Sequence, residues 1–219
     1  MSGIGMTSMR SRKRLVDQLR ELGVSDQEVL DAILNVPRHE FVDEALASHA
    51  YENSALPIGW GQTISQPLTV AIMTAKLREN FPTGMNHVLE IGTGCGYQAA
   101  VLAPFAKKVI SVERISQLHR AARKRLVAMK LRNVLCLHDD GFMGCQNYAP
   151  YDGILAAAVS NDIPEELIDQ LADGGRLIMP VKLSNSSDQR LVVVDKTPTG
   201  IKKSELSAVS FVPRKSGIS

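Results

Sequence analysis

Three glycines at alternate positions are the residues of this chain whose types and spacing point most clearly to chemistry. They are Gly92, Gly94 and Gly96, and they follow the apolar run Val88–Ile91, which has the length of a strand. Glycines between a strand and a helix let the backbone bend sharply and let a ligand approach main-chain atoms that a Cβ would shield. The pattern predicts a ligand-binding loop; the alternative is a glycine-rich turn with only a structural role.

The spacing separates this loop from two common nucleotide sites. A dinucleotide fingerprint, G-x-G-x-x-G, would need a glycine where the chain has Tyr97, and no phosphate-binding G-x-x-x-x-G-K-[ST] sequence occurs. Glu90 precedes the first glycine by two residues. An acid placed this way before G-x-G-x-G resembles the first motif of the Rossmann-like methyltransferases, which bind S-adenosylmethionine.

A second acid ends the next apolar run. Glu113 closes Val109–Glu113 and lies 17 residues after Gly96. This is close to the offset of about 20 residues at which an acid binds ribose hydroxyls in related folds. The two carboxylate oxygens can accept from both hydroxyls of a ribose. The alternative is a surface acid that pairs with Arg114 or with another neighbouring residue.

The sequence Asp139-Asp140-Gly141 follows a third apolar run, Val134–Leu137. A carboxylate here could accept a hydrogen bond from the amino group of adenine. Asp-Gly is also ordinary turn chemistry, so a plain turn is the alternative. The sequence does not decide which of the two aspartates would contact the base.

These groups would meet if the runs that carry them are parallel strands of one sheet. From Gln66 onward strands alternate with helices, which predicts an α/β fold with a mostly parallel, doubly wound sheet, and ligands bind such sheets at the carboxyl ends of the strands. The expected strands are Val88–Ile91, Val109–Glu113, Val134–Leu137, Ile154–Ala157 and Leu177–Val181. Four helices are expected. One begins at Pro67, and the others span Gln98–Ala103, Gln117–Met129 and Pro164–Leu171, the last closed by Gly174-Gly175.

The two ends of the chain depart from this alternation. Leu191–Asp195, a turn at Thr197–Gly200, and Ser207–Val212 predict antiparallel C-terminal strands at the sheet edge. The N-terminal part predicts three helices: one at Arg10–Leu22, a second that begins with a capping box formed by Ser25 and Glu28, and a short third one near Phe41–Leu46. An irregular segment from Tyr51 to Pro67 follows them. We expect one domain over 1–219, with an N-terminal helical extension and substrate segment in 1–65 and a Rossmann-like core in 66–219.

Composition bounds the class of protein. The chain has 219 residues, of which 44% are hydrophobic, and a formal net charge of +2, so no broad basic surface for nucleic acid is expected. The basic cluster from Arg120 to Arg125 is interleaved with apolar residues at helical spacing and predicts a solvated helix face. Three cysteines without metal-ligand spacing, no apolar leader and no membrane-length run favour a cytoplasmic protein.

The segment Ile58–Pro67, which reads I-G-W-G-Q-T-I-S-Q-P, makes the resemblance more specific. From about Arg14 to Pro213 the chain closely resembles the protein-L-isoaspartate O-methyltransferase family. The G-Q-T-I-S-Q-P part is the specific one, because generic methyltransferases lack it. Other matching stretches are Val36–Arg38, Phe41–Ala45, Val88–Gln98, Ser111–Ile115, Ala149–Asp152, Gly174–Leu177 and Phe211–Pro213.

The resemblance implies an enzyme that uses S-adenosyl-L-methionine to methylate the free carboxylate of L-isoaspartyl, and D-aspartyl, residues in damaged proteins. It implies that Ser65 is the active-site residue, that Thr63, Ile64 and Ala157 lie on the substrate side, and that Gln189 lies near the cofactor. The residues expected to hold the cofactor are Glu90, Gly92, Thr93, Gly94, Gly96, Glu113, Asp139, Asp140, Gly141 and Gln189.

This reaction makes few chemical demands. A carboxylate with a pKa of about 3.5–4 is already ionised at neutral pH, and the sulfonium donor leaves as a neutral thioether. Neither a metal nor a strong general base is needed, and no His or Cys pattern indicates either. Catalysis would then come from alignment and the exclusion of water. Ser65 would position the carboxylate through its hydroxyl; its alternative role is the N-cap of the helix that begins at Pro67.

Departures from the family pattern concern the substrate side. Ala157 replaces a usual threonine, Lys182 a glycine, Arg214 a leucine and Phe142 a tryptophan. Two other functions therefore stay open: a methyltransferase of the same fold with another carboxylate acceptor, and a non-catalytic paralogue that binds the cofactor. The expected partners are isoaspartyl peptides and proteins, without nucleic acid or membrane, and we expect a monomer.

Overall fold

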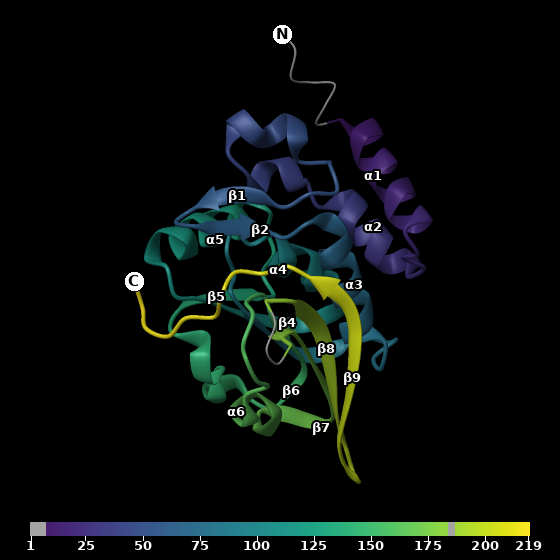
Figure 1. Ribbon diagram of the computed structural model, residues 1–219. Coiled ribbons are helices and arrows are strands. Elements are labelled where there is room, and N and C mark those ends of the chain that lie inside the picture. The colour runs from purple at the N-terminus through teal and green to yellow at the C-terminus, as the bar shows by residue number, and fades with distance from the viewer. Residues whose placement is uncertain (1–7, 184–186) are drawn as a thin grey trace.

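The computed structural model describes residues 8–183 and 187–219, and a twisted sheet forms its centre (Figure 1). Among the described residues seven strands form this sheet, in the order β5-β4-β3-β6-β7-β8-β9. They are β3 (Met85–Ile91), β4 (Ala106–Glu113), β5 (Val134–His138), β6 (Tyr151–Ala156), β7 (Leu171–Lys182), β8 (Gln189–Thr197) and β9 (Gly200–Val209). Strands β3 to β7 are parallel, and β8 and β9 are antiparallel. The predicted fold class is confirmed.

The order of the strands places a ligand site beside β3. The chain proceeds from β3 outward through β4 to β5 and then returns to the other side of β3 as β6. Ile91 at the end of β3 pairs with Val112 on one side and Ala156 on the other. The connections that leave these neighbouring strands run in opposite directions, which leaves a crevice at the carboxyl ends of the strands.

Alternate residues of the central strands face two apolar layers. Val88 and Val109 belong to one buried cluster, while Leu89 and Ile110 belong to the other. The first layer is covered by α3 (Pro67–Arg78), α4 (Tyr97–Leu102), η3 (Ala103–Phe105) and α5 (Ser116–Ala128). The second is covered by η5 (Gln146–Tyr148) and α6 (Glu165–Asp169). This two-sided burial explains why the strands read as continuous apolar runs.

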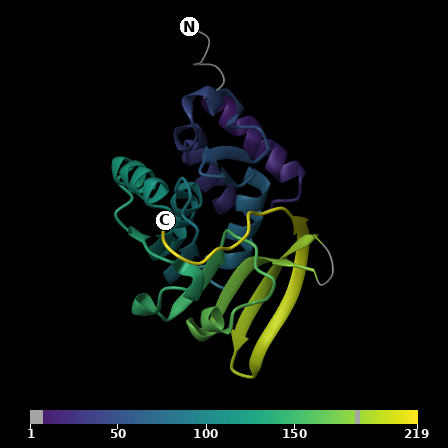
Figure 2. The same ribbon diagram turned by 60° about the vertical axis from the view of Figure 1, so that its left-hand side comes forward.

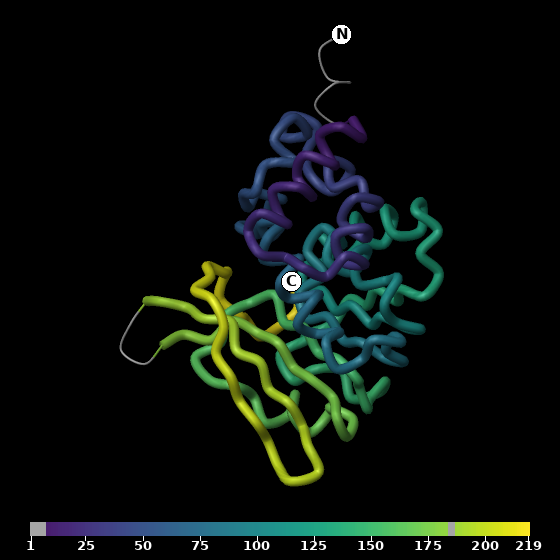
Figure 3. The backbone as a smooth tube through the Cα atoms, turned by 90° about the vertical axis from the view of Figure 1, so that its right-hand side faces the viewer, coloured from purple at the N-terminus to yellow at the C-terminus, as the bar shows by residue number. Residues whose placement is uncertain are grey.

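The N-terminal elements lie at one end of the molecule and the β8–β9 hairpin extends along the other (Figures 2 and 3). They are α1 (Met9–Glu21), α2 (Gln27–Asn35), η1 (Arg38–Phe41), η2 (Glu44–His49) and the antiparallel pair β1 (Leu56–Gly59) and β2 (Gln62–Ile64). Leu19, Ile33 and Phe41 are buried in the first apolar layer. None of the helices in the described ranges is long and apolar enough to cross a membrane.

The predicted capping box at Ser25 is wrong. The N-cap of α2 is Asp26, whose Oδ1 accepts a hydrogen bond from the Val29 amide at 3.1 Å. Arg78, from the end of α3, donates to Asp26 Oδ2 at 2.6 Å and also pairs with Glu28. Glu28 therefore takes part in a contact between two helices that are distant in sequence, and the helix begins one residue later than its local pattern suggests.

Three other boundaries differ from prediction. The helix expected over Pro164–Leu171 ends at Asp169. The glycines expected to close it, Gly174 and Gly175, lie in β7, where the pairing of β6 with β7 shifts register. A Cβ on Gly175 would lie 2.8 Å from the carbonyl oxygen of Tyr151, so the close strand approach requires glycine. The expected third helix is the two 3-10 turns η1 and η2, and the segment read as irregular contains the β1–β2 hairpin.

Candidate functional site

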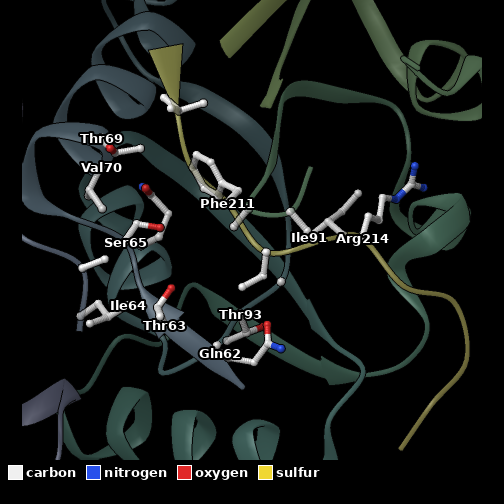
Figure 4. A pocket seen from close by; sticks show the side chains of 18 of the residues that line it. Gln62, Thr63, Ile64, Ser65, Thr69, Val70, Ile91, Thr93, Phe211 and Arg214 are labelled. Carbon is white, nitrogen blue, oxygen red and sulfur yellow. The ribbon is translucent and has the colours of Figure 1, made fainter. Parts of the chain in front are cut away.

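A pocket of about 650 Å³ lies at the carboxyl ends of the parallel strands (Figure 4). Its wall includes residues that follow four different strands: Gly92 and Gly94 after β3, Glu113 at the end of β4, Gly141 after β5 and Ala157 after β6. The structure thus brings together strand-end groups that are up to 65 residues apart in sequence. The parallel sheet predicts this convergence.

The glycine loop adopts a backbone that residues with a Cβ rarely adopt. The φ angles are +92° at Gly92, +55° at Gly94 and +93° at Gly96. Gly92, Thr93 and Gly94 line the pocket. Gly96 does not; a Cβ there would lie 3.3 Å from the Ala122 Cβ on α5. Gly96 therefore permits close packing of α5 behind the loop.

Glu113 is the acid that reaches the pocket wall. Its residue is only 4% exposed, and both carboxylate oxygens accept backbone hydrogen bonds. Oε2 accepts from the Gly94 amide at 2.8 Å, and Oε1 accepts from the Ile115 amide at 2.9 Å. A carboxylate oxygen can accept a second hydrogen bond, so Glu113 both fixes the glycine loop and retains acceptor capacity for a ligand. The alternative reading, a surface acid paired with Arg114, is wrong.

At the end of β5, Gly141 lines the pocket and the two aspartates do not. Asp139 is exposed, and its Oδ1 accepts from the Asp140 amide at 2.8 Å. Asp140 is the N-cap of η4 (Gly141–Met143), and its Oδ1 accepts from the Phe142 amide at 2.9 Å. A Cβ on Gly141 would lie 2.8 Å from Ile91 Cγ2, so glycine is needed for the turn to pack on β3.

Glu90 lies beneath the loop rather than at the pocket wall. It is fully buried, and its Oε2 accepts a hydrogen bond from the Ser111 hydroxyl. The Ser111 oxygen lies 2.5 Å from Thr93 Oγ1, so a polar chain links Glu90 to the pocket wall. Burial raises the pKa of Glu90 to about 8. Glu90 therefore supports the loop as a largely neutral acid at pH 7 and does not itself face a ligand.

Ser65 faces the pocket from the opposite side. It follows β2, which brings Gln62, Thr63 and Ile64 to the same wall. Figure 4 shows the hydroxyls of Ser65 and Thr63 directed into the pocket. The alternative role of Ser65 as a helix cap is wrong: the N-cap of α3 is Gln66, and the Leu68 amide donates to Asn53 Oδ1 at 3.0 Å.

The β1–β2 hairpin is in contact with the glycine loop. A Cβ on Gly94 would lie 3.3 Å from Ile58 Cδ1. Ala157 closes the floor nearby: its amide donates to the Ile91 carbonyl at 2.9 Å, and its Cβ lies 3.6 Å from where a Gly92 Cβ would be. The residues expected on the substrate side therefore share one pocket with half of those expected to hold the cofactor, namely Gly92, Thr93, Gly94, Glu113 and Gly141.

The segment after β9 forms a wall that the sequence did not assign to the site. Phe211, Val212, Pro213, Arg214 and Lys215 line the pocket, and Figure 4 shows this segment crossing it, with Arg214 on the side away from Ser65. The predicted strand over Ser207–Val212 is wrong beyond Val209.

Gln189 holds that wall from outside the pocket. Its side-chain Oε1 accepts from the Phe211 amide at 2.6 Å, and its Nε2 donates to the Phe211 carbonyl at 3.1 Å. These two bonds replace strand pairing at Phe211 and direct the chain across the pocket. Gln189 does not line the pocket, although we expected it near the cofactor.

Comparisons with known proteins agree on one family. The family model described as "Protein-L-isoaspartate(D-aspartate) O-methyltransferase" matches residues 10–218. A protein-L-isoaspartate O-methyltransferase of Alcanivorax borkumensis is 54% identical over 218 residues, covering 100% of this chain and 97% of its own length. One from Halorhodospira halophila is 53% identical over 216 residues, covering 99% and 96%.

Solved structures give the same result. A protein-L-isoaspartate O-methyltransferase structure superposes with a TM-score of 0.84 at 30% identity, covering 94% of this chain and 67% of that one. A candidate enzyme of the same name from Plasmodium falciparum, in complex with S-adenosyl-L-homocysteine, gives a TM-score of 0.80 at 25% identity, covering 93% and 98%.

Proposed function

The chain belongs to the protein-L-isoaspartate(D-aspartate) O-methyltransferase family, and we propose that its pocket carries out that family's reaction with the residues described here. The protein is an S-adenosylmethionine-dependent methyltransferase that methylates the free carboxylate of isoaspartyl residues and so begins the repair of damaged proteins.

The residues at the strand ends fit S-adenosylmethionine. Glu113 offers a buried carboxylate at the pocket wall with acceptor capacity beyond its two backbone partners, which suits two ribose hydroxyls. Gly92 and Gly94 leave main-chain atoms at the wall unshielded. Gly141 brings the turn after β5 to the pocket wall beside Ile91, where the base could lie. We assign the ribose to Glu113 and the adenine to the Gly141 side.

We assign the acceptor carboxylate to Ser65. When bound, S-adenosylmethionine supplies a methyl group on a positively charged sulfur. The isoaspartyl carboxylate is ionised at neutral pH, so the chain has no proton to remove before transfer. The Ser65 hydroxyl donates to one carboxylate oxygen and so directs the other along the line of attack.

The surrounding residues exclude water from this line. Ile64 is 3% exposed, and Phe211 faces Ser65 across the pocket in Figure 4. An apolar surface near the hydroxyl strengthens its hydrogen bond to a charged acceptor, because water would otherwise compete for it. Thr63 and Ala157 then contact the peptide around the isoaspartyl residue.

We further propose that the partners are isoaspartyl peptides and proteins, that the chain works as a cytoplasmic monomer, and that it binds neither nucleic acid nor membranes. A net charge of +2 supports the exclusion of nucleic acid, because phosphate contacts require a concentration of basic residues. We also propose that 1–65 and 66–219 act as one domain, since β2 and the glycine loop share the pocket.

The single observation that carries this assignment is that Ser65, Glu113 and the glycine loop line one pocket, into which the Ser65 hydroxyl is directed (Figure 4). Labelled donor, an isoaspartyl peptide and a mixture of small carboxylic acids in one reaction test it. We expect base-labile label on the peptide. Label on a small acid would instead support another acceptor, and donor binding without any transfer would support a non-catalytic paralogue.

A further inference from the structure

Arg38 is a fully buried cation to which the described part of the chain offers no acid. It begins η1 and is 0% exposed. Its Nη2 donates to the Ser54 carbonyl at 3.2 Å, while Nε and Nη1 have no hydrogen-bond partner among the described residues. A buried charge is costly unless an opposite charge accompanies it, so Arg38 calls for a function that repays this cost.

The titratable groups that interact with the Arg38 guanidinium are neutral at pH 7. They are Tyr97, Cys95 and Tyr51. Burial raises the pKa of Tyr97 to about 12 and that of Cys95 to about 11, and it raises the pKa of Tyr51 as well. Burial also lowers the pKa of Arg38, but an arginine side chain stays protonated at neutral pH. The positive charge is therefore present without a negative charge to balance it in the described residues.

The guanidinium lies directly behind the wall of the pocket. It lies 4.8 Å from the centre of the Tyr97 ring, and Tyr97 lines the pocket. The Ser54 carbonyl that it binds immediately precedes Ala55, which is another lining residue. Arg38 itself does not line the pocket. Its charge is thus separated from the pocket by one layer of protein, formed by Ala55 and Tyr97.

This part of the wall is joined to the segment that carries Ser65. Asn53, the neighbour of Ser54, accepts a hydrogen bond through its Oδ1 from the Leu68 amide at 3.0 Å. Leu68 is the second residue of α3 and follows Ser65 by three positions. The chain that Arg38 binds is therefore also bound to the start of α3, beside the acceptor end of the pocket.

The basic residues that line the pocket belong to its other end. They are Arg114, Arg214 and Lys215. Figure 4 shows Arg214 on the side away from Ser65, and Lys215 follows it in the chain. Arg114 directly follows Glu113, to which we assigned the ribose. An anion beside Ser65 would therefore rely on a cation behind the wall.

We propose that Arg38 is a positioning residue for the acceptor: its positive charge, acting through the wall formed by Ala55 and Tyr97, draws the ionised carboxylate of the isoaspartyl residue toward Ser65. The inference rests on the proposed function of Ser65. Charges interact more strongly inside a protein than in water, so a cation behind the wall stabilises an anion within the pocket. The carboxylate loses its charge when it becomes a methyl ester, so Arg38 favours the substrate over the product and helps the product to leave.

Two variants of Arg38 and two peptides test the charge itself. Arg38→Met removes the charge and keeps an unbranched side chain, and Arg38→Lys is the matched control because it keeps the charge. The first peptide contains an isoaspartyl residue. In the second, an isoasparaginyl residue replaces it, so that a neutral carboxamide of nearly the same shape stands in for the carboxylate. Calorimetry with saturating S-adenosyl-L-homocysteine measures the affinity of each protein for each peptide.

We expect Arg38→Met to bind the isoaspartyl peptide roughly tenfold more weakly than wild type, the effect of a charge about 10 Å away at an effective dielectric constant of about 20. Its affinity for the carboxamide peptide should stay within about twofold of wild type, and Arg38→Lys should bind both peptides within about threefold of wild type. Equal weakening of both peptides in Arg38→Met would show that Arg38 only shapes the wall. That result, or unchanged affinity for both, would overturn the proposal.

The cofactor carries a carboxylate too, so its affinity is the second arm of the test. We expect S-adenosyl-L-homocysteine to bind Arg38→Met within about twofold of wild type. Weaker binding of S-adenosyl-L-homocysteine with unaltered binding of the isoaspartyl peptide would assign the charge to the cofactor and overturn the proposal.

Steady-state kinetics separate positioning of the substrate from a general loss of structure. Because the carboxylate loses charge during methyl transfer, Arg38→Met should raise KM for the isoaspartyl peptide without lowering kcat. A lower kcat at constant KM would contradict the proposal. Thermal unfolding without ligand shows whether each variant is folded, and Arg38→Gln, which keeps an N–H donor for Ser54, replaces Arg38→Met if that variant unfolds.

Failure of this inference differs from failure of the proposed function. A wild-type chain that does not methylate the isoaspartyl peptide would refute the proposed function. A wild-type chain that methylates it, with Arg38 variants that bind both peptides as wild type does, would refute only the role of Arg38.

Discussion

Replacing Glu113 by glutamine is the most informative single perturbation of the cofactor site. Each oxygen of Glu113 accepts one backbone N–H, from Gly94 and from Ile115. In Glu113→Gln an NH2 group replaces one oxygen and meets one of those two donors, so a hydrogen bond to the loop or to the turn after β4 is lost. The charged acceptor proposed for the ribose is lost as well.

The structure sets the size of this effect. A hydrogen bond to a charged acceptor contributes about 1.5–3 kcal/mol, so S-adenosyl-L-homocysteine should bind about 10- to 100-fold more weakly to Glu113→Gln. Isothermal titration calorimetry measures the affinity, and circular dichroism shows that the fold is kept. The control is Glu205→Gln on β9, an exposed acid that does not line the pocket. Affinity within twofold of wild type in folded Glu113→Gln would refute the assignment of the ribose to Glu113.

Four further variants test the remaining assignments. Ser65→Ala should lower kcat about 5- to 150-fold, the effect of about 1–3 kcal/mol, and leave the affinity for S-adenosyl-L-homocysteine unchanged; full activity would remove Ser65 from the reaction. Ala157→Thr should lower KM for an isoaspartyl peptide at constant cofactor affinity, and an unaltered KM would place position 157 outside the substrate contacts. Gly141→Ala forces a Cβ to within 2.8 Å of Ile91 Cγ2 and should cost about 1–3 kcal/mol in the free energy of unfolding; an unshifted urea midpoint contradicts this. Glu90 has its pKa raised by burial to about 8, so the folded state holds a proton that the unfolded state, at about 4.5, releases. The free energy of unfolding should therefore fall from about pH 5 to pH 8, by at most about 1.4 kcal/mol per pH unit, and Glu90→Gln should flatten this dependence. Urea titrations at several pH values measure it. An equal pH dependence in wild type and Glu90→Gln would show that Glu90 does not cause the fall.

Local patterns predicted the sheet because its strands are buried on both faces. Val88, Leu89, Val109 and Ile110 face alternate apolar layers, which makes each strand a continuous apolar run that ends at a recognisable turn. The same logic placed Gly92, Gly94 and Glu113 at neighbouring strand ends. Each of these residues directly follows or ends an apolar run, and parallel strands end at the same edge of the sheet. Their positions could therefore be predicted without knowledge of distant contacts.

Features set by distant contacts were not predictable in this way. The start of α2 depends on Arg78, which lies 52 residues after Asp26. The end of β9 depends on the Gln189 side chain, which occupies the backbone groups of Phe211. Whether an acid faces the pocket also depends on tertiary packing. Glu90 accepts a hydrogen bond from the Ser111 hydroxyl, and Asp140 accepts one from the Gly217 amide. Neither bond has a signature in the local sequence.

Two synthetic peptides that differ only in the linkage of one aspartyl residue test whether the chain methylates isoaspartyl carboxylates. Wild-type chain, labelled S-adenosylmethionine and each peptide are combined, and the methyl ester is located by mass spectrometry and released as methanol by mild base. We expect an ester on the α-carboxylate of the isoaspartyl peptide and none on its normal L-aspartyl twin. Equal labelling of both peptides, or labelling of neither while the cofactor still binds, would contradict it.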